Sequence, residues 1–458
     1  MAKKDPNERI CIIGAGPAGL TAAMYLEQAG YKNYEILEKD GEVGGKCHSP
    51  TWNGKRYDTG AIMGCDSYYT IMDVQKFTGD TGKELEGPPL VAELDYRRSN
   101  GKKYDPMNPK YPKNWLRLGR YLVALKKMAS ILETKYEGYD VNGHIGVADG
   151  KYEGYRANGN TEWISGTNEN LKDLALPFKD FCKKNGVSLV QELWILPYTS
   201  FGYGYFDEIP AAYVFKYLDF YTLGEFLKNR LWTWKDGTQS IWENLNAKLK
   251  HPARLNSVIT SIRREDGKVF VTVNGLEEEY DDVIVTAPLQ FMDQYFDVTT
   301  EEKELFSKID YSRYMTMGCL TKQGQYPPRS TYILENQIPQ KLGHLMIYYM
   351  RWKNEEDQPI MTYALRTRLD TKEIPEEQCK SMVIKDMKTF ESEVEKVVFE
   401  RSWYYFPHIY SEDYANGWYD KVEAMQGQKN TYYAGEIMAF GDMEETATYS
   451  KSIVDRFF

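Results

Sequence analysis

Several patterns that mark common protein classes are missing from this sequence. No CxxC, HExxH or GxSxG motif occurs among its 458 residues, and only five residues are histidine. These absences argue against a zinc site, a metalloprotease and a serine hydrolase, so no metal centre is expected. The cysteines are also few and scattered, and we expect all of them to be buried, reduced thiols. They are Cys11, Cys47, Cys65, Cys182, Cys319 and Cys379.

Long apolar runs and an excess of positive charge are lacking too. No stretch approaches 18 uninterrupted apolar residues, so no membrane-spanning helix is expected. The first residues are polar and lack the apolar centre of a signal peptide, which predicts a cytoplasmic location. With 57 basic and 67 acidic residues the formal charge is -10, which disfavours nucleic acid as a partner. The length of 458 residues predicts two or three domains.

The beginning of the chain carries a nucleotide-binding pattern. Residues 10 to 13 form an apolar run typical of a buried parallel strand, and residues 20 to 28 predict a helix. Between them stand Gly14, Gly16 and Gly19 in GxGxxG spacing. Such glycines permit a tight turn, close approach of a pyrophosphate and close packing of helix on strand. The amino terminus of the helix would then face the phosphates.

A second strand strengthens this interpretation. Residues 34 to 38 predict a strand that ends in Glu38, 19 residues beyond Gly19. An acid at this distance can accept hydrogen bonds from a ribose hydroxyl. Because strand, turn, helix, strand and acid occur in order, we favour a dinucleotide site over a glycine turn that serves chain geometry alone.

Two further segments indicate which dinucleotide is bound. Residues 44 to 46, Gly-Gly-Lys, follow the acid and end in a cation able to face a phosphate. Near the carboxyl end, residues 431 to 434 predict a strand that leads into Gly435 and Glu436. Both segments resemble those of the flavin amine oxidoreductases.

That resemblance implies FAD, bound without a covalent link. It implies that Glu436 bonds the ribityl chain, that a backbone amide at Val258 lies against adenine, and that the helix from about Met443 faces the flavin ring. The cofactor-binding residues expected are Gly14, Gly16, Pro17, Ala18, Gly19, Glu38, Lys39, Gly44, Gly45, Lys46, Gly60, Ala61, Ile62, Val258, Gly435, Glu436, Glu445 and Thr446.

The fold class expected is α/β, with a discontinuous Rossmann-like domain in an amine-oxidase-like arrangement. Residues 5–78, 232–290 and 400–458 would form the FAD-binding domain. Residues 79–231 would form a mainly helical cap that lines a substrate tunnel. Residues 291–399 mix strands and helices and would form an α+β domain on the substrate side.

The stretch from residue 194 to residue 234 is unusually aromatic. It holds 14 aromatic residues in 41 positions and only 7 charged ones. For any single aromatic residue, packing in the core is the simpler interpretation. The stretch ends where the cofactor domain resumes, however, and a narrow aromatic tunnel leading to a flavin would suit a long apolar substrate.

Over nearly its whole length the chain resembles the bacterial polyunsaturated fatty acid isomerases. The matching segments are 44–50, 60–64, 201–204, 210–214, 216–220, 231–234, 403–408 and 434–438. The resemblance implies an FAD enzyme that converts linoleic acid to a conjugated diene, by moving a hydride from the doubly allylic carbon to another carbon. An oxidase or desaturase acting on a long apolar substrate or an amine is the alternative, and a non-catalytic lipid or flavin binding module is a third hypothesis.

By the same resemblance, Phe201 and Phe226 are expected to line the fatty-acid channel and to position the substrate. Tyr203, Tyr213 and Met63 are further candidates for its lining. Aromatic faces there could stabilise a delocalised cation by about 1 to 2 kcal/mol each.

The carboxylate end of the substrate lacks an obvious anchor. Ala92 stands where the isomerases have an arginine, and Arg97 and Arg98 are the nearby substitutes. Residues 106–132 contain six cations and no acid. They predict either an amphipathic helix that contacts anionic lipid or a solvated basic face.

Overall fold

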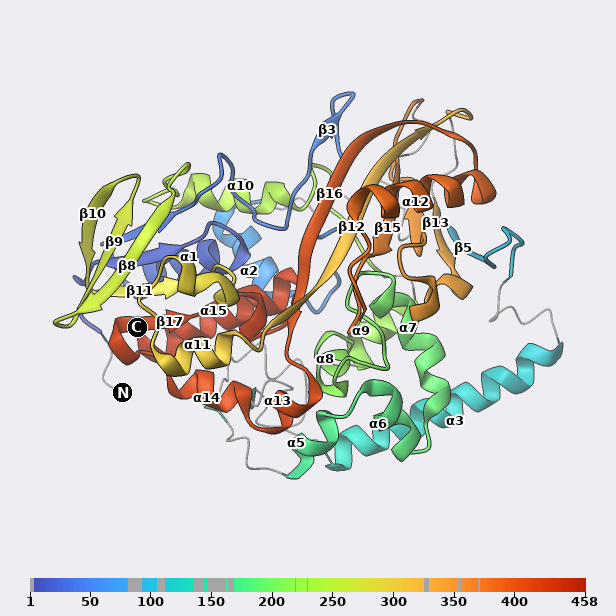
Figure 1. The fold of residues 1–458 in the computed structure, drawn as a ribbon, viewed down its shortest axis with the longest axis horizontal. Coiled ribbons are helices and arrows are strands. Elements are labelled where there is room, and N and C mark those ends of the chain that lie inside the picture. Colours follow the sequence, from blue (N-terminus) through green and yellow to red (C-terminus); the bar gives the residue numbers. More distant parts are fainter. Residues whose placement is uncertain are drawn as a thin grey trace.

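The computed structural model describes residues 4–80, 93–104, 112–135, 144–145, 162–163, 169–218, 220–228, 230–324, 329–352, 356–369 and 371–458. Figure 1 shows three regions: a part at the left that holds the predicted nucleotide-binding motif, called the nucleotide-binding part below, a large twisted sheet at the upper right, and a group of helices at the lower right. The chain visits the left part at its beginning, in its middle and at its end, so both termini lie there.

The nucleotide-binding part is built on a parallel sheet. Among the described residues its strand order is β17-β11-β1-β2. The strands are β1 (Ile10–Ile13), β2 (Tyr34–Leu37), β11 (Asp282–Val285) and β17 (Thr431–Tyr433). Apart from Glu35 and Asp282, each is a short run of apolar or β-branched side chains that is buried almost throughout, as expected of a parallel strand covered on both faces. The strands predicted at residues 10 to 13, 34 to 38 and 431 to 434 are confirmed.

Helices and a small antiparallel sheet complete this part. Helix α1 packs against α15 and α10, and α2 packs against α10 and α15. The helices are α1 (Pro17–Ala29), α2 (Tyr69–Thr78), α10 (Gln239–Lys248) and α15 (Met443–Phe457). The antiparallel strands are β8 (Ile259–Glu265), β9 (Lys268–Val273) and β10 (Leu276–Tyr280). Strand β10 has little signal in the sequence, because Leu276–Tyr280 holds three glutamates in a row and lacks an alternating apolar pattern.

The second sheet has the order β16-β12-β15-β14-β13-β5 among the described residues. Its strands are β5 (Glu93–Arg97), β12 (Asp310–Thr321), β13 (Arg329–Ile333), β14 (Ile347–Tyr349), β15 (Ile360–Leu365) and β16 (Val394–His408). Helix α12 (Glu376–Phe390) packs on it. Long strands β12 and β16 run side by side from this sheet down to the nucleotide-binding part.

The predicted division into domains differs from these elements at two places. The limit at residue 400 falls inside β16, which is one continuous strand because its pairing with β12 continues past that point. Strand β5 belongs to the predicted helical cap, yet it pairs in parallel with β13 at the sheet edge. Short hydrophilic strands such as Glu93–Arg97 gain their stability from the partner strand, so their own sequence gives little signal.

The helical region lies below the second sheet (Figure 1). Its elements are α3 (Pro112–Lys135), α5 (Glu169–Leu174), α6 (Phe178–Lys184), η1 (Ser188–Val190), α7 (Gln191–Thr199), α8 (Ala211–Tyr217) and α9 (Phe220–Leu227). Its interior is aromatic: the ring of Phe178 meets those of Phe206 and Phe215 at 4.6 and 5.6 Å. Smaller elements are α11 (Thr300–Phe306), α13 (Ser411–Ala415) and α14 (Trp418–Ala424).

A buried polar joint fixes the two sheets relative to each other. The Arg351 guanidinium pairs with the Asp58 carboxylate, and both side chains are almost fully buried. Next to this pair, the carbonyl of Thr59 accepts hydrogen bonds from Thr316 Oγ1 at 2.9 Å and Trp403 Nε1 at 2.7 Å. The segment that follows β1, α1 and β2 is therefore held on the second sheet, which places residues 60–63 between the two.

Candidate functional site

A cavity of about 670 Å³ lies where the carboxyl edge of the parallel sheet meets the second sheet. This is the edge at which open α/β sheets bind ligands. Most of the expected cofactor residues line it: Gly14, Gly16, Pro17, Ala18, Glu38, Lys39, Gly45, Lys46, Gly60, Ala61, Ile62, Val258, Gly435, Glu436 and Thr446. The fold thus brings together residues from the beginning, middle and end of the chain around one space.

Three parallel strands supply one wall of the cavity, through Gly14, Thr286 and Gly435. Gly14 has a φ of +102° and Gly435 a φ of +106°, conformations that side chains other than glycine rarely adopt. A Cβ at Gly14 would stand 2.8 Å from Thr286 Oγ1, and one at Gly435 would stand 2.9 Å from the Thr286 carbonyl oxygen. The two glycines therefore pack on either side of Thr286 and let the backbone itself form the wall.

The first βα turn is arranged to receive an anion. Helix α1 begins at Pro17, and no described side chain caps its amino terminus at Gly16. The Glu38 carboxylate accepts hydrogen bonds from the N–H groups of Ala15 at 2.8 Å and Asp40 at 2.9 Å. These bonds hold the turn after β1 against the end of β2. An uncapped helix start offers N–H groups and a positive dipole to a phosphate.

One ion pair joins two distant segments of the cavity lining. Lys46 Nζ lies 2.5 Å from Glu436 Oε2, which links the double-glycine segment to the carboxyl-terminal one. The same ammonium group lies 5.5 Å from the ring centroid of Tyr311 and 5.7 Å from that of Tyr405. Lys46 thus stands at the border between the polar half of the cavity and its aromatic half.

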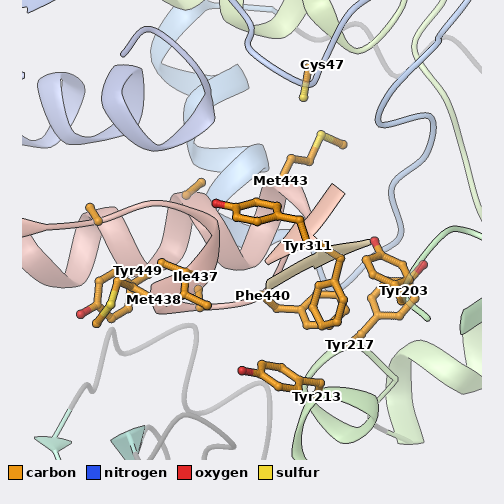
Figure 2. Close-up of a cluster of buried hydrophobic side chains, with 14 of the residues drawn as sticks. Cys47, Tyr203, Tyr213, Tyr217, Tyr311, Ile437, Met438, Phe440, Met443 and Tyr449 are labelled. Atoms are coloured by element: carbon orange, nitrogen blue, oxygen red, sulfur yellow. The ribbon is translucent and has the colours of Figure 1, made fainter. Parts of the chain in front are cut away.

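The aromatic half is walled by side chains from the helical region, from the second sheet and from the segment before α2. They are Met63, Tyr68, Phe201, Tyr203, Tyr217, Tyr311, Tyr314, Tyr363, Trp403, Tyr404 and Tyr405. Figure 2 shows Tyr203 and Tyr217 beside Phe440; the ring centroid of Tyr203 lies 4.6 Å from that of Tyr217 and 4.7 Å from that of Phe440. Such contacts fix the rings and leave their faces as a rigid apolar lining.

Burial keeps these side chains neutral. It raises the pKa of Tyr203, Tyr217, Tyr314 and Tyr405 well above the usual value, so their hydroxyls stay protonated at physiological pH. Burial also raises the pKa of the Cys47 thiol to about 12. The apolar half therefore offers no thiolate or phenolate nucleophile from these groups.

Three expected cofactor residues lie outside the lining. Gly19 and Gly44 stand behind it: Gly19 packs on Gly14, and the N–H of Gly44 donates to the carbonyl of Ala15 at 2.9 Å. Glu445 turns away and lies 3.0 Å from Lys216 Nζ in a buried ion pair. Val258 lines the cavity, and its own N–H donates to Asn274 Oδ1 at 3.0 Å.

The expected substrate residues divide in the same way. Met63, Phe201 and Tyr203 line the cavity. Phe226 stands outside the lining, with its ring 6.4 Å from that of Phe201. Tyr213 lies deeper in the helical region, where its hydroxyl bonds Tyr419 at 2.7 Å.

Neither proposed substitute for the missing arginine reaches the cavity lining. Arg97 is held by Asp95 at 2.7 Å and Glu391 at 3.3 Å, and Arg98 lies on the surface 3.3 Å from Glu335. Acids close to β5 thus draw both guanidinium groups away. Ala92 lies outside the described residues.

Several lining residues were not predicted as site residues. Thr286 directly follows β11, whereas Tyr311, Tyr314 and Tyr363 lie in β12 and β15, and no local motif surrounds them. Trp403 and Tyr405 lie in a segment that we matched to the isomerases without giving it a role. In β16, that run of aromatic residues at the end of a strand was the one available signal.

Within the described ranges, no group of three or more histidine, cysteine, aspartate or glutamate side chains is placed to hold a metal ion. All six cysteines fall within those ranges, and each is buried and forms no disulfide, as predicted. Among the helices described, none is long and apolar enough to cross a bilayer.

Comparison with known proteins gives relatives of two kinds. A CLA-producing fatty acid isomerase from P. acnes is 46% identical in sequence, and its structure covers 99% of this chain and 100% of its own with a TM-score of 0.88. A putrescine oxidase variant is 13% identical, with a TM-score of 0.68 over 98% of this chain and 97% of its own, and shows the fold alone.

Among curated proteins, the polyenoic fatty acid isomerase of Ptilota filicina is 26% identical over 217 residues. That match spans 46% of this chain and only 40% of the length of that relative.

The family of flavin containing amine oxidoreductases matches residues 17–448, nearly the whole chain. The match begins at Pro17, after Gly14 and Gly16, and it includes the double-glycine segment, the Lys46–Glu436 pair and the aromatic wall. The amine-oxidase-like α/β fold predicted from the sequence is thereby confirmed, and the chain belongs to the flavin containing amine oxidoreductase family.

Proposed function

We propose that this protein is an FAD-dependent isomerase that converts free polyunsaturated fatty acids, such as linoleic acid, to conjugated dienes. The observation that carries the proposal is its 46% identity to a CLA-producing fatty acid isomerase over the full length of both chains. The aromatic half of the cavity supports it, since a long apolar chain needs a long apolar lining.

The polar half of the cavity fits the FAD that the family implies. The uncapped start of α1 would hold the pyrophosphate, and Glu38 the ribose of the adenosine. Lys46 and Glu436 would lie along the ribityl chain, with Val258 beside adenine. Thr446, in the first turns of α15, would face the ring.

The cofactor would be held without a covalent bond. Attachment of a flavin through sulfur needs a thiolate, and burial keeps the Cys47 thiol in the lining protonated. Denaturing the protein with acid should therefore release all of its flavin into the supernatant. Flavin that stays with the precipitated chain would contradict this part of the proposal.

A bound flavin supplies an acceptor that can take a hydride from the doubly allylic carbon and return it to another carbon of the chain. The protein's own residues provide the surroundings for that transfer. Loss of a hydride leaves the fatty acid with a delocalised positive charge, which the faces of Phe201, Tyr203 and neighbouring rings can stabilise. The hydroxyls of Tyr203 and Tyr405 in these walls stay protonated, so they are not strong nucleophiles that would attack the cation.

No general base is needed for this reaction. The electron pair that leaves with the hydride returns with it, so substrate and product have the same composition.

A cytoplasmic location for the enzyme stays a prediction.

An anaerobic assay tests the proposal. The purified holoprotein is incubated without oxygen with linoleic or linolenic acid, and products are followed by conjugated-diene absorbance and mass spectrometry. A product of unchanged mass with conjugated double bonds is expected. Absence of any conjugated product from several polyunsaturated acids would overturn the proposal.

The same assay in air distinguishes the alternative. An oxidase or desaturase would consume oxygen in proportion to substrate and would yield a product lighter by two hydrogens. The isomerase should consume none.

A further inference from the structure

Helix α3 presents an apolar face to solvent. Four of its large hydrophobic side chains are exposed: Trp115 by 66%, Leu116 by 78%, Leu122 by 60% and Val123 by 69%. The other three follow Trp115 by one, seven and eight residues, which places all four on one side of an α-helix. We call these four residues the α3 patch. Exposed apolar groups that gather in this way mark an interaction surface.

The opposite side of α3 is firmly attached to the protein. Tyr121 and Met128 are buried there, and Arg117 pairs with Glu192 at the start of α7. Arg117 Nε also donates to the Tyr121 hydroxyl at 2.8 Å. The α3 patch therefore points outward on a helix that is already folded and fixed. Figure 1 shows the amino-terminal part of α3 extending beyond the other helices.

Cations surround the α3 patch. Arg120, Lys126 and Lys127 are exposed on the same helix, and residues 106–132 contain no acid. The whole chain carries a formal charge of -10, so this local positive charge is opposite in sign to the rest of the protein. Only a negatively charged partner can approach this face with an electrostatic gain.

We propose that the α3 patch docks the protein on the surface of an anionic lipid bilayer. Trp115 and the aliphatic side chains would enter the headgroup boundary, while the lysine and arginine heads would meet lipid phosphates. Tryptophan favours that boundary because its ring is apolar and its N–H is polar. A second copy of the chain is a poor occupant, since two such faces would bring their cations together.

The position of α3 gives the docking a use. Helix α3 packs on η1, which leads directly into α7, and α7 ends two residues before Phe201 in the cavity lining. The docked helix and one wall of the cavity thus belong to the same region of the fold. The docking itself depends only on the surface, and it stands whether or not the protein isomerises fatty acids.

Vesicle flotation with the full-length holoprotein tests the proposal. Vesicles of phosphatidylcholine alone are compared with vesicles that also contain phosphatidylglycerol. We expect binding to the second kind, weakened by salt, and little to the first. Equal binding to both, or to neither, would overturn the proposal.

Two variants of α3 sharpen the test, and each has a matched control. Leu122→Gln with Val123→Gln should weaken binding at least about tenfold, because two apolar groups leave the boundary. The control replaces Leu276 and Ile338, exposed aliphatic residues elsewhere, by glutamine. All four positions are exposed, so folding should be unaffected.

The charge variant changes Arg120, Lys126 and Lys127 to glutamine. Each cation near an anionic surface contributes about fivefold to binding, so the loss should be about 100-fold. Its control changes Lys32, Lys248 and Lys250, which are exposed on the nucleotide-binding part. Both triple variants have the same net charge, and equal binding by the two would contradict docking through α3.

Size-exclusion chromatography with light scattering tests whether a second copy of the chain covers the α3 patch instead. A dimer that the patch variant converts to a monomer, together with no vesicle binding by the unaltered protein, would assign the α3 patch to self-association and overturn the proposal.

Discussion

Substitution of Gly435 by alanine tests the central feature of the site, the packing of two glycines on Thr286. Gly435 has a φ of +106°, and an alanine held there costs about 1 to 2 kcal/mol. The new Cβ would stand 2.9 Å from the Thr286 carbonyl oxygen, closer than real Cβ atoms come. Strand β17 cannot retreat easily, because the N–H of Ala434 donates to Val285 at 2.8 Å.

The strain should therefore be relieved by residues 435 and 436 moving into the cavity. That movement would shift Glu436 away from Lys46. Together, the backbone and contact costs amount to about 2 to 4 kcal/mol. We expect Gly435→Ala to fold, with a lower melting temperature, and to bind FAD at least about tenfold more weakly.

The assay titrates FAD into flavin-free protein and measures the dissociation constant by fluorescence, with thermal unfolding alongside. Gly54→Ala is the matched control. Gly54 also has a positive φ, +73°, but a Cβ there would meet nothing within 4 Å. This control should lose about 1 kcal/mol of stability and no affinity for FAD. The same FAD affinity and the same loss of stability in both variants would refute the proposed role of the contact with Thr286.

Three further predictions concern stability, reactivity and catalysis. Burial tends to raise the pKa of Glu302, but hydrogen bonds from Arg264 and Tyr433 outweigh it and lower that pKa to about 2. The ionised carboxylate should stabilise the fold by about 2 to 3 kcal/mol above pH 4.5, and this contribution should vanish toward pH 2. Denaturation of Glu302→Gln beside the unaltered protein should therefore show a difference in the free energy of unfolding that shrinks in acid. A difference that does not depend on pH would contradict this. With a pKa of about 12, only about one Cys47 thiol in ten thousand is ionised at pH 8. Mass spectrometry should therefore find Cys47 unlabelled by thiol reagents until the chain unfolds. Rapid labelling in the folded state would count against the burial of this thiol. Phe201→Leu should lower kcat/KM about tenfold, because it removes one aromatic face from the lining. Phe226 lies behind the lining, so Phe226→Leu should change kcat/KM less than about threefold. Equal losses in the two variants would contradict the placement of the two rings.

The nucleotide-binding motif was predictable because its signals are local. Ile10–Ile13, the glycines after it and Glu38 have their meaning within one βαβ unit, where turn geometry and strand burial depend on neighbouring residues. Gly435 and Glu436 repeat such a local pattern at the other end of the chain. The structure places both patterns on one cavity.

The aromatic half of the site was only partly predictable. The stretch from 194 to 234 indicated a large apolar lining, and Phe201 and Tyr203 lie in it. Phe226 and Tyr213 come from the same stretch and lie elsewhere, because helix faces and long-range packing decide which ring points inward. No composition rule distinguishes these four residues.

The sequence by itself predicted a nucleotide site on the first βα turn and buried cysteines without disulfides, and it indicated the flavin amine oxidoreductase family. Tertiary structure alone decided that Thr286 lies between two glycines more than 400 residues apart, that Tyr311, Tyr363 and Trp403 complete the aromatic wall, and that Arg97 and Arg98 are held by acids outside the cavity. The physical reason is that turns and strands follow from adjacent residues, whereas a lining depends on which distant surfaces the sheets bring into contact.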